Sequence, residues 1–145
     1  MIAIDTNLLV YAHRREAPGH DRAAQLLSQL ARGPERWGIP WPCVAEFFSV
    51  VTNPKIWKGR ESTPTQALAQ VGGWSASPSV VLLAEVESTL EVLSGIVRRA
   101  GVRGAAIHDA RIAAICLSHG VTELLTADRD FSRFHELVVR NPLGP

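Results

Sequence analysis

Short apolar runs alternate with segments of helical periodicity along this chain, and this alternation limits its fold more than any other feature. Apolar runs of strand length lie at residues 1–4, 80–83, 123–126 and 137–139. The segments between them repeat apolar residues at the spacing of a helix face. The pattern predicts an α/β fold of three layers, with helices on both sides of a small, mainly parallel central sheet.

Turn and cap residues set the expected limits of the helices. Pro42 suits the first turn of a helix through 44–51 that stops before Asn53-Pro54. Gly72-Gly73 is expected to close the helix that Ser62-Thr63-Pro64 opens. Residues 80–83 are entirely apolar, which is typical of a strand buried on both faces. The Pro-interrupted segment 37–41 predicts at best a brief strand, and further helices are expected at 8–12, 23–30, 90–99 and 107–118.

Composition indicates one domain and excludes a protein that binds nucleic acid or another polyanion through its overall charge. The 145 residues are 46% hydrophobic, and no repeat or long linker divides them, so residues 1–145 are expected to form a single domain. The net charge of +1 means that a nucleic acid must be held by local contacts. No apolar run approaches the ~20 residues of a membrane span, and no basic leader precedes Met1–Ile4. We therefore expect a cytoplasmic protein without a membrane segment.

Four acidic residues stand where a fold of this kind gathers ligands. Asp5 and Asp128 each follow an apolar strand, and parallel strands end at the same edge of a sheet. Asp109 opens a largely apolar helix, and Glu46 lies in the most hydrophobic helix, where a carboxylate needs a partner. Taken singly, each has an ordinary explanation as a helix cap, a turn former, a helix-start charge or one half of an ion pair.

Taken together, the four acids point to a cation. Like charges gathered at one edge repel one another unless a positive charge neutralises them. An all-carboxylate set suits a hard divalent ion such as Mg²⁺ or Mn²⁺, which prefers oxygen ligands and leaves positions for phosphate oxygens.

The acidic residues lie in four stretches that span nearly the whole chain. They are Ile4-Asp5-Thr6-Asn7, Glu46 in its apolar helix, His108-Asp109-Ala110-Arg111-Ile112-Ala113-Ala114 and Thr126-Ala127-Asp128-Arg129-Asp130-Phe131. In this order they resemble the motifs of PIN-domain ribonucleases, and within them the VapC-type toxins of bacterial toxin–antitoxin pairs. The resemblance implies a PIN-like fold and Asp5, Glu46, Asp109 and Asp128 as the catalytic, metal-binding cluster. It further implies Thr6, Asn7, Thr126 and Asp130 as supporting groups.

The implied activity is a metal-dependent endoribonuclease that hydrolyses RNA phosphodiester bonds through a metal-activated water. We expect Asp5 and Asp109 to bind the principal ion directly, and Glu46 and Asp128 to hold it, a second ion or the water. Products with a 5′-phosphate and a 3′-hydroxyl are expected. Two alternatives stay open at this point: a metal-dependent phosphatase of another α/β family, in which Asn7 would stand where a second Asp is usual, and a non-catalytic PIN-like RNA-binding domain.

Arginines dominate the basic residues and supply candidate substrate contacts. Thirteen of the 15 basic residues are Arg, whose planar guanidinium suits phosphates and bases. Arg14 and Arg15 follow the first predicted helix, and Arg111 and Arg129 lie beside motif acids. Trp57, in a basic loop, is a candidate for stacking on an RNA base.

The resemblance also implies partners. These are an RNA substrate, with transfer RNA favoured, a VapB-type antitoxin that places a basic residue against the acidic site, and a second copy of the chain in a homodimer.

Overall fold

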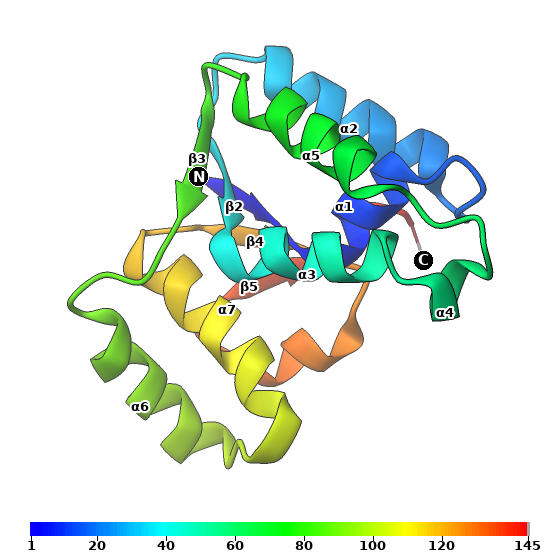
Figure 1. The fold of residues 1–145 in the computed structure, drawn as a ribbon. Helices are drawn as coiled ribbons and strands as arrows, with labels where there is room; N and C mark the ends of the chain where they lie inside the picture. The colour runs from blue at the N-terminus through cyan, green and yellow to red at the C-terminus, as the bar shows by residue number, and fades with distance from the viewer. Residues whose placement is uncertain (145) are drawn as a thin grey trace.

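The computed structural model describes residues 1–144, and Pro145, the last residue of the expected domain, lies outside the described residues. Within residues 1–144 a five-stranded sheet lies between two layers of helices (Figure 1). The strands are β1 (Ile2–Ile4), β2 (Trp37–Pro40), β3 (Val80–Leu83), β4 (Glu123–Leu125) and β5 (Val138–Arg140). The helices are α1 (Thr6–His13), α2 (His20–Arg32), α3 (Trp41–Val51), α4 (Pro54–Trp57), α5 (Pro64–Ser75), α6 (Thr89–Ala100) and α7 (Ile107–Ser118), with 3₁₀ turns η1 (Gly104–Ala106) and η2 (Arg129–Arg133).

The strand order is β3-β2-β1-β4-β5, and every neighbouring pair is parallel. The chain moves outward from β1 through β2 to β3 and then returns to β4 and β5 on the other side of β1. Because parallel crossovers are right-handed, this reversal places the first helices on one face and the later ones on the other. In agreement, α1, α2, α3 and α5 pack together, as do α6, α7 and η2 (Figure 1). The expected three-layer α/β fold with a parallel sheet is confirmed.

Local signals set several element ends as expected. Pro42 lies in the first turn of α3, which ends before Asn53. Thr63 caps α5 in a reciprocal arrangement: its hydroxyl accepts from the Gln66 amide, and the Gln66 side chain accepts from the Thr63 amide. The segment 37–40 does form a strand, and Trp37 and Ile39 in it are buried in the core. The expectation of a brief strand is confirmed, and the strand pairs with the central strand β1.

The glycine pair does not close α5, contrary to expectation. The helix continues through Gly72 and Gly73 to Ser75. Trp74 is buried there, with its ring centroid 5.1 Å from that of Phe47 on α3. Burying a Trp contributes more than the roughly 1 kcal/mol that each glycine costs in a helix, so tertiary packing extends the helix.

The strand at 80–83 is an edge strand, and the expectation that both its faces are buried was wrong. In β3 only Leu83 is fully buried, while Val80, Val81 and Leu82 are partly exposed. Figure 1 shows β3 at the margin of the sheet, with β2 as its neighbour. An apolar run of four residues therefore marked a strand correctly but gave no information on its position in the sheet.

Two glycine substitutions are expected to act in opposite directions. A Cβ at Gly38 in β2 would lie 2.7 Å from Cδ1 and 3.0 Å from Cγ of the buried Leu83, so Gly38→Ala should lower the free energy of unfolding by about 1–3 kcal/mol. A Cβ at Gly73 meets no atom within 4 Å, so Gly73→Ala should raise it by about 0.5–1 kcal/mol. Urea unfolding of both variants measures this, and equal effects of the same sign would contradict the packing described for β2.

Candidate functional site

A pocket of about 290 Å³ opens at the carboxyl ends of β1 and β4, the edge at which the sequence places its acids. It contains all four residues of the predicted cluster. Its lining consists of Asp5, Thr6, Asn7, Val10, Tyr11, Glu46, Val50, Asp109 and Asp128. Residues that lie up to 123 positions apart in the sequence therefore share one cavity.

Asp5 is the buried floor of the pocket. It follows β1 directly and stands at the N-cap position of α1, and it is only 4% exposed. One carboxylate oxygen, Oδ2, accepts from the Thr126 hydroxyl at 2.7 Å, and the other, Oδ1, faces the Cys43 thiol at 3.5 Å. Burial raises the pKa of Asp5, and the hydrogen bond from Thr126 partly opposes this effect.

Asn7 and Thr126 connect the two strand ends. The Asn7 amide nitrogen donates to Asp5 at 3.3 Å and to the Thr126 hydroxyl at 3.2 Å, while its oxygen accepts from the Ala127 backbone amide. The Thr126 hydroxyl also accepts from the Asp128 amide at 2.9 Å. These contacts fix the orientation of Asp5 and the path of the chain toward Asp128. The supporting positions predicted from the motif therefore have direct structural partners.

Glu46 reaches the pocket from the solvent side of α3. Its side chain is exposed, and Oε2 accepts from the Thr6 hydroxyl at 2.8 Å. The most hydrophobic helix of the chain does not enclose Glu46, because Ala45, Glu46 and Ser49 form the exposed face of a helix that buries Cys43, Val44, Phe47 and Val51. The large apolar neighbours Val44 and Phe47 point to the other side.

Three aspartates come closest together at the rim. Carboxylate oxygens of Asp109, Asp128 and Asp130 all lie within 4.8 Å of one another. Asp128 caps η2 by accepting from the Asp130 amide, so this turn brings the exposed Asp130 toward the first turn of α7, where Asp109 lies. Asp130, predicted only as a supporting group, belongs to the tightest carboxylate cluster of the described residues.

The gathering of these carboxylates disfavours the ionised form of Asp109. Its pKa is raised to about 6, first by partial burial and then by the negative charges of Asp128, Asp5, Glu46 and Asp130, in that order. Four carboxylates thus act on a fifth in this pocket. An all-oxygen donor set of this kind fits a hard divalent cation, and a positive charge there would lower the pKa of Asp109 again.

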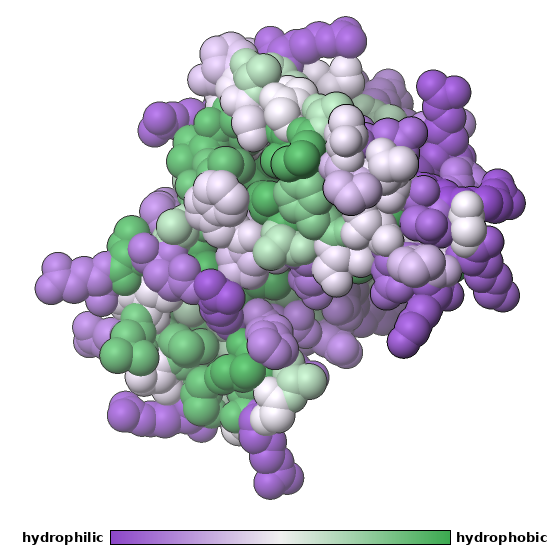
Figure 2. Space-filling view, in the orientation of Figure 1, coloured by the Kyte–Doolittle hydropathy of each residue, from purple (hydrophilic) through white to green (hydrophobic). Residues whose placement is uncertain are grey.

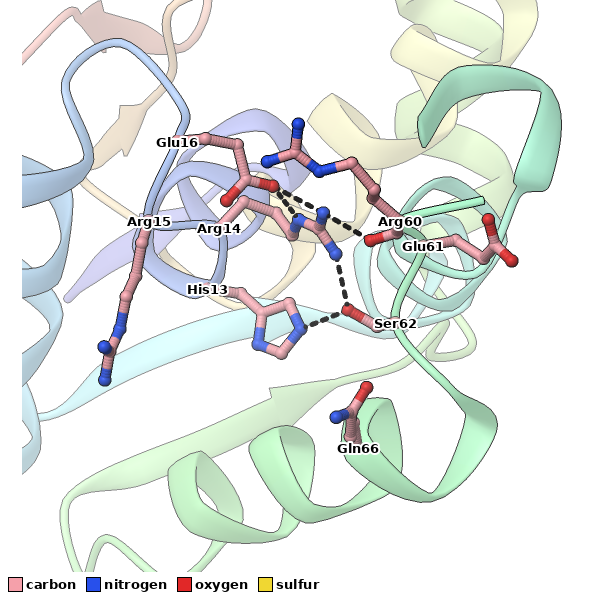
Figure 3. A pocket seen from close by; sticks show the side chains of 8 residues that line it. All are labelled: His13, Arg14, Arg15, Glu16, Arg60, Glu61, Ser62 and Gln66. Atoms are coloured by element: carbon pink, nitrogen blue, oxygen red, sulfur yellow. Dashed lines mark hydrogen bonds and ion pairs between the residues drawn. The ribbon is translucent and has the colours of Figure 1, made fainter. Parts of the chain in front are cut away.

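The predicted substrate arginines do not gather in this pocket. Arg111 projects from α7 into two neighbouring cavities and forms an ion pair with Glu85. Arg129 is exposed in η2, between Asp128 and Asp130. Arg14 and Arg15 line a separate cavity beyond the far end of α1 (Figure 3).

Sequence reasoning missed Tyr11, which is half-buried and lines the pocket. Tyr11 lies four residues after Asn7 in α1, and residues at this spacing share one face of a helix. That spacing was the available signal.

Comparison with known proteins agrees with this geometry. The family model described as "PIN domain" matches residues 2–137. The VapC ribonuclease Mb2897 of Mycobacterium bovis is 34% identical over 143 residues, covering 99% of this chain and 96% of that protein. The ribonuclease VapC48 of Mycobacterium tuberculosis is 28% identical over 140 residues, covering 97% and 96%.

Solved structures share the fold at lower identity. VapBC2 from Rickettsia felis, solved with a DNA fragment from its promoter, superposes with a TM-score of 0.70 at 18% identity and covers 97% of this chain and 98% of its own. VapC20 of Mycobacterium tuberculosis, described as a sarcin-ricin loop cleaving toxin, gives 0.67 at 17% identity, covering 91% and 93%.

The raised pKa of Asp109 predicts that removing its charge increases thermal stability, and that the increase depends on pH. Because the folded-state pKa of about 6 lies above the unfolded value of 3.8, the stability that Asp109 contributes to the metal-free protein is fully present below pH 3.8 and is lost as the pH rises through 6. In EDTA at pH 7.5, Asp109→Asn should therefore raise Tm by about 2–4 °C, a modest gain because solvent screens the half-exposed group. At pH 4 the two proteins should unfold together. Thermal unfolding followed by circular dichroism measures both, and a gain of the same size at both pH values would contradict the electrostatic cause.

Proposed function

The chain belongs to the PIN-domain family and, within it, to the VapC ribonucleases, and from this premise we propose that the acidic pocket is the catalytic centre of a toxin endoribonuclease. The observation that carries the proposal is the convergence of four carboxylates on a fifth, Asp109. The resemblance drawn from the motifs is confirmed by the family match across residues 2–137. Nothing favours the phosphatase or the non-catalytic domain. Family and donor chemistry support a divalent metal, and we propose Mg²⁺ or Mn²⁺ as its identity.

We assign the residues to roles by their surroundings. Asp5 is held rigidly by Thr126 and Asn7, so we propose it as the fixed ligand at the floor of the pocket. Asp109 and Asp128, at the rim, would complete the hold on the ion, with Asp130 beside them. Glu46 is exposed and oriented by Thr6, which suits it to accept a proton from a water that enters from solvent.

The bound ion supplies the positive charge that polarises the attacking water and stabilises the phosphate as charge develops. The chain's own residues position and shield the reaction. Val10, Tyr11 and Val50 supply the less polar part of the pocket lining, which would limit water at the site. The ionised carboxylates themselves repel the RNA backbone, so substrate is expected to enter the pocket only when the cation is present.

We propose further features from the family and the surface. The partner is a VapB-type antitoxin, whose basic residue would occupy the acidic pocket; transfer RNA is the proposed substrate, and the chain acts as one PIN domain in the cytoplasm. Within residues 1–144 no helix has the length and apolar character needed to cross a bilayer.

A homodimer is supported by apolar surface on α6 and α7. Figure 2 shows hydrophobic side chains gathered over the part of the molecule that these helices form. Leu90 on α6 is 73% exposed, and with Val86, Leu93 and Ile107 it lines a cavity of about 450 Å³. Such contiguous apolar surface is typical of a protein interface.

RNA cleavage tests the proposed activity. The purified protein is incubated with total transfer RNA in Mg²⁺ or Mn²⁺ and again in EDTA, and the product ends are mapped. We expect cleavage with 5′-phosphate ends, its loss in EDTA, and a decrease of about a hundredfold or more in Asp109→Asn, because a charged metal ligand is removed.

Asp21→Asn is the matched control, since Asp21 is exposed in the first turn of α2 and lies outside the pocket. It should cleave like the parent. Cleavage that persists in EDTA and in Asp109→Asn would overturn the metal mechanism, and turnover of a small phosphate monoester with RNA left intact would favour the phosphatase.

Sedimentation velocity tests the dimer. The parent chain should sediment as a dimer, and Leu90→Glu should sediment as a monomer, because it places a charge in the proposed apolar interface. Leu68→Glu, on the exposed face of α5, is the control and should stay dimeric. A monomeric parent chain, or a dimer that survives Leu90→Glu, would contradict this interface.

A further inference from the structure

A second, basic pocket lies at the other end of the helix that begins in the acidic one. Asp5 stands at the start of α1, and the residues that follow its end line a cavity of about 500 Å³ (Figure 3). The lining residues are His13, Arg14, Arg15, Glu16, Arg60, Glu61, Ser62 and Gln66. We call this cavity the arginine pocket. Nine residues at 1.5 Å each put Arg14 about 13 Å along the helix from Asp5.

Arg14 is the fixed centre of the arginine pocket. Its side chain is only 10% exposed and forms an ion pair with Glu16. The guanidinium also donates to the Ser62 hydroxyl at 3.0 Å and to the Arg60 carbonyl at 2.7 Å, and it lies 4.0 Å from the ring centroid of Trp57. Arg14 thereby ties the loop after α4 to the end of α1 and gives the cavity a preformed wall.

Because Arg14 covers one face of the Trp57 ring, an RNA base cannot stack on that face. The Trp57 indole also donates to the Val50 carbonyl at 2.8 Å, so the ring is held in place. The expectation that Trp57 stacks on an RNA base is therefore not supported, and the ring serves instead to position a cation. A nucleic acid reaching this pocket meets guanidinium groups, which select its phosphates.

Arg15 and Arg60 supply guanidinium groups that form no hydrogen bond or ion pair with the other residues lining the pocket. Both side chains are exposed, and in Figure 3 no hydrogen bond or ion pair joins either guanidinium to the other residues drawn. Glu16 is paired with Arg14, and Figure 3 shows the Glu61 carboxylate directed away from the arginines. The pocket thus presents two available guanidinium groups beside a neutralised pair.

The loop around the pocket concentrates charge further. Both lysines of the chain, Lys55 and Lys58, lie in the segment 55–61 that carries Arg60. Residues 14–16 and 55–61 together hold five basic and two acidic side chains, whereas the whole chain has a net charge of only +1. A nearly neutral protein therefore has a local surplus of positive charge next to its acidic site.

We propose that the arginine pocket binds a backbone phosphate of the RNA strand whose scissile phosphate lies in the acidic pocket, with Arg15 and Arg60 as the contacts and Arg14 as the positioning residue. The inference rests on the proposed ribonuclease function. The separation of about 13 Å corresponds to about four nucleotides of a stacked strand at about 3.4 Å each, and to fewer in an extended strand. Occupation of both pockets would set which bond is cut relative to the anchored phosphate.

The test compares Arg15→Gln/Arg60→Gln with a control of equal charge change, Arg32→Gln/Arg36→Gln. Arg32 and Arg36 are exposed and lie at the end of α2 and before β2, at the sheet edge opposite the acids. Binding of a fluorescently labelled, random-sequence RNA 12-mer and an RNA dinucleotide is measured by anisotropy in EDTA over a range of salt. Cleavage of the same 12-mer is followed separately in Mg²⁺, and thermal unfolding confirms that all variants are folded.

We expect the arginine-pocket variant to bind the 12-mer about tenfold more weakly at low salt. The slope of log affinity against log salt should become shallower by about 0.7 for each phosphate that the variant no longer neutralises. The control should bind like the parent. The dinucleotide, whose single phosphate can occupy only the arginine pocket in EDTA, should also bind the pocket variant more weakly than it binds the control. The 12-mer result together with an unchanged control supports the inference.

Equal affinity and slope for the pocket variant and the parent, with RNA still cleaved in Mg²⁺, would overturn the inference and leave the ribonuclease function intact. A parent protein that neither binds nor cleaves RNA would overturn both. Poly-glutamate serves as a probe for an acidic protein partner. If the pocket variant loses affinity for poly-glutamate but not for the 12-mer, the pocket belongs to a protein interface and the RNA assignment is wrong.

Discussion

The parallel pairing of β1 with β4 is the constraint on which the site depends. The ladder joins Ile4 to Leu125, and the Asp5 amide donates to the Leu125 carbonyl at 3.0 Å, so the residues after both strands emerge side by side. Asp5 and Thr126 then meet by geometry rather than by attraction. Because the sheet forces carboxylates together at this edge, the fold loses stability there, and a bound cation would return it. With the proposed metal in the pocket, metal binding and folding would be thermodynamically linked.

Charge is separated along a single helix. The acids lie at the start of α1 and the surplus of guanidinium groups lies at its end, so a net charge near zero conceals two opposed regions. Such a separation suits a polyanionic substrate that binds at one region of the surface and is not attracted to the rest of it. The proposed cation would mask the acidic end, while the basic end needs no cofactor. Affinity for a strand and reactivity toward one of its bonds can thus depend on different residues.

Much of the fold could be predicted from local pattern, because strand and helix periods, Pro42 and the Thr63 cap act within a few residues. The predictions that failed concern features that depend on contacts between residues far apart in the sequence. The glycines at 72 and 73 favour a helix end locally, but Trp74 finds Phe47 on another helix, and this packing outweighs the local preference. The apolar run 80–83 has the same composition whether it lies at the centre or the edge of the sheet. Strand order, which decides its burial, is not encoded in those four residues.

The site residues likewise divide into those that could be predicted from local sequence and those that could not. Asp5 and Asp128 could be predicted because each follows a strand, and parallel strands end at one edge. The exposure of Glu46 could not be judged from its apolar neighbours, since the helix turns them to the opposite side. Arg14 shows most clearly the limit of prediction from the sequence. Sequence position suggested a substrate contact, but the loop at 57–62 surrounds its guanidinium with a ring, a hydroxyl and a carbonyl. A group so fully engaged loses most of its freedom before any ligand arrives, so binding at its pocket requires little further ordering.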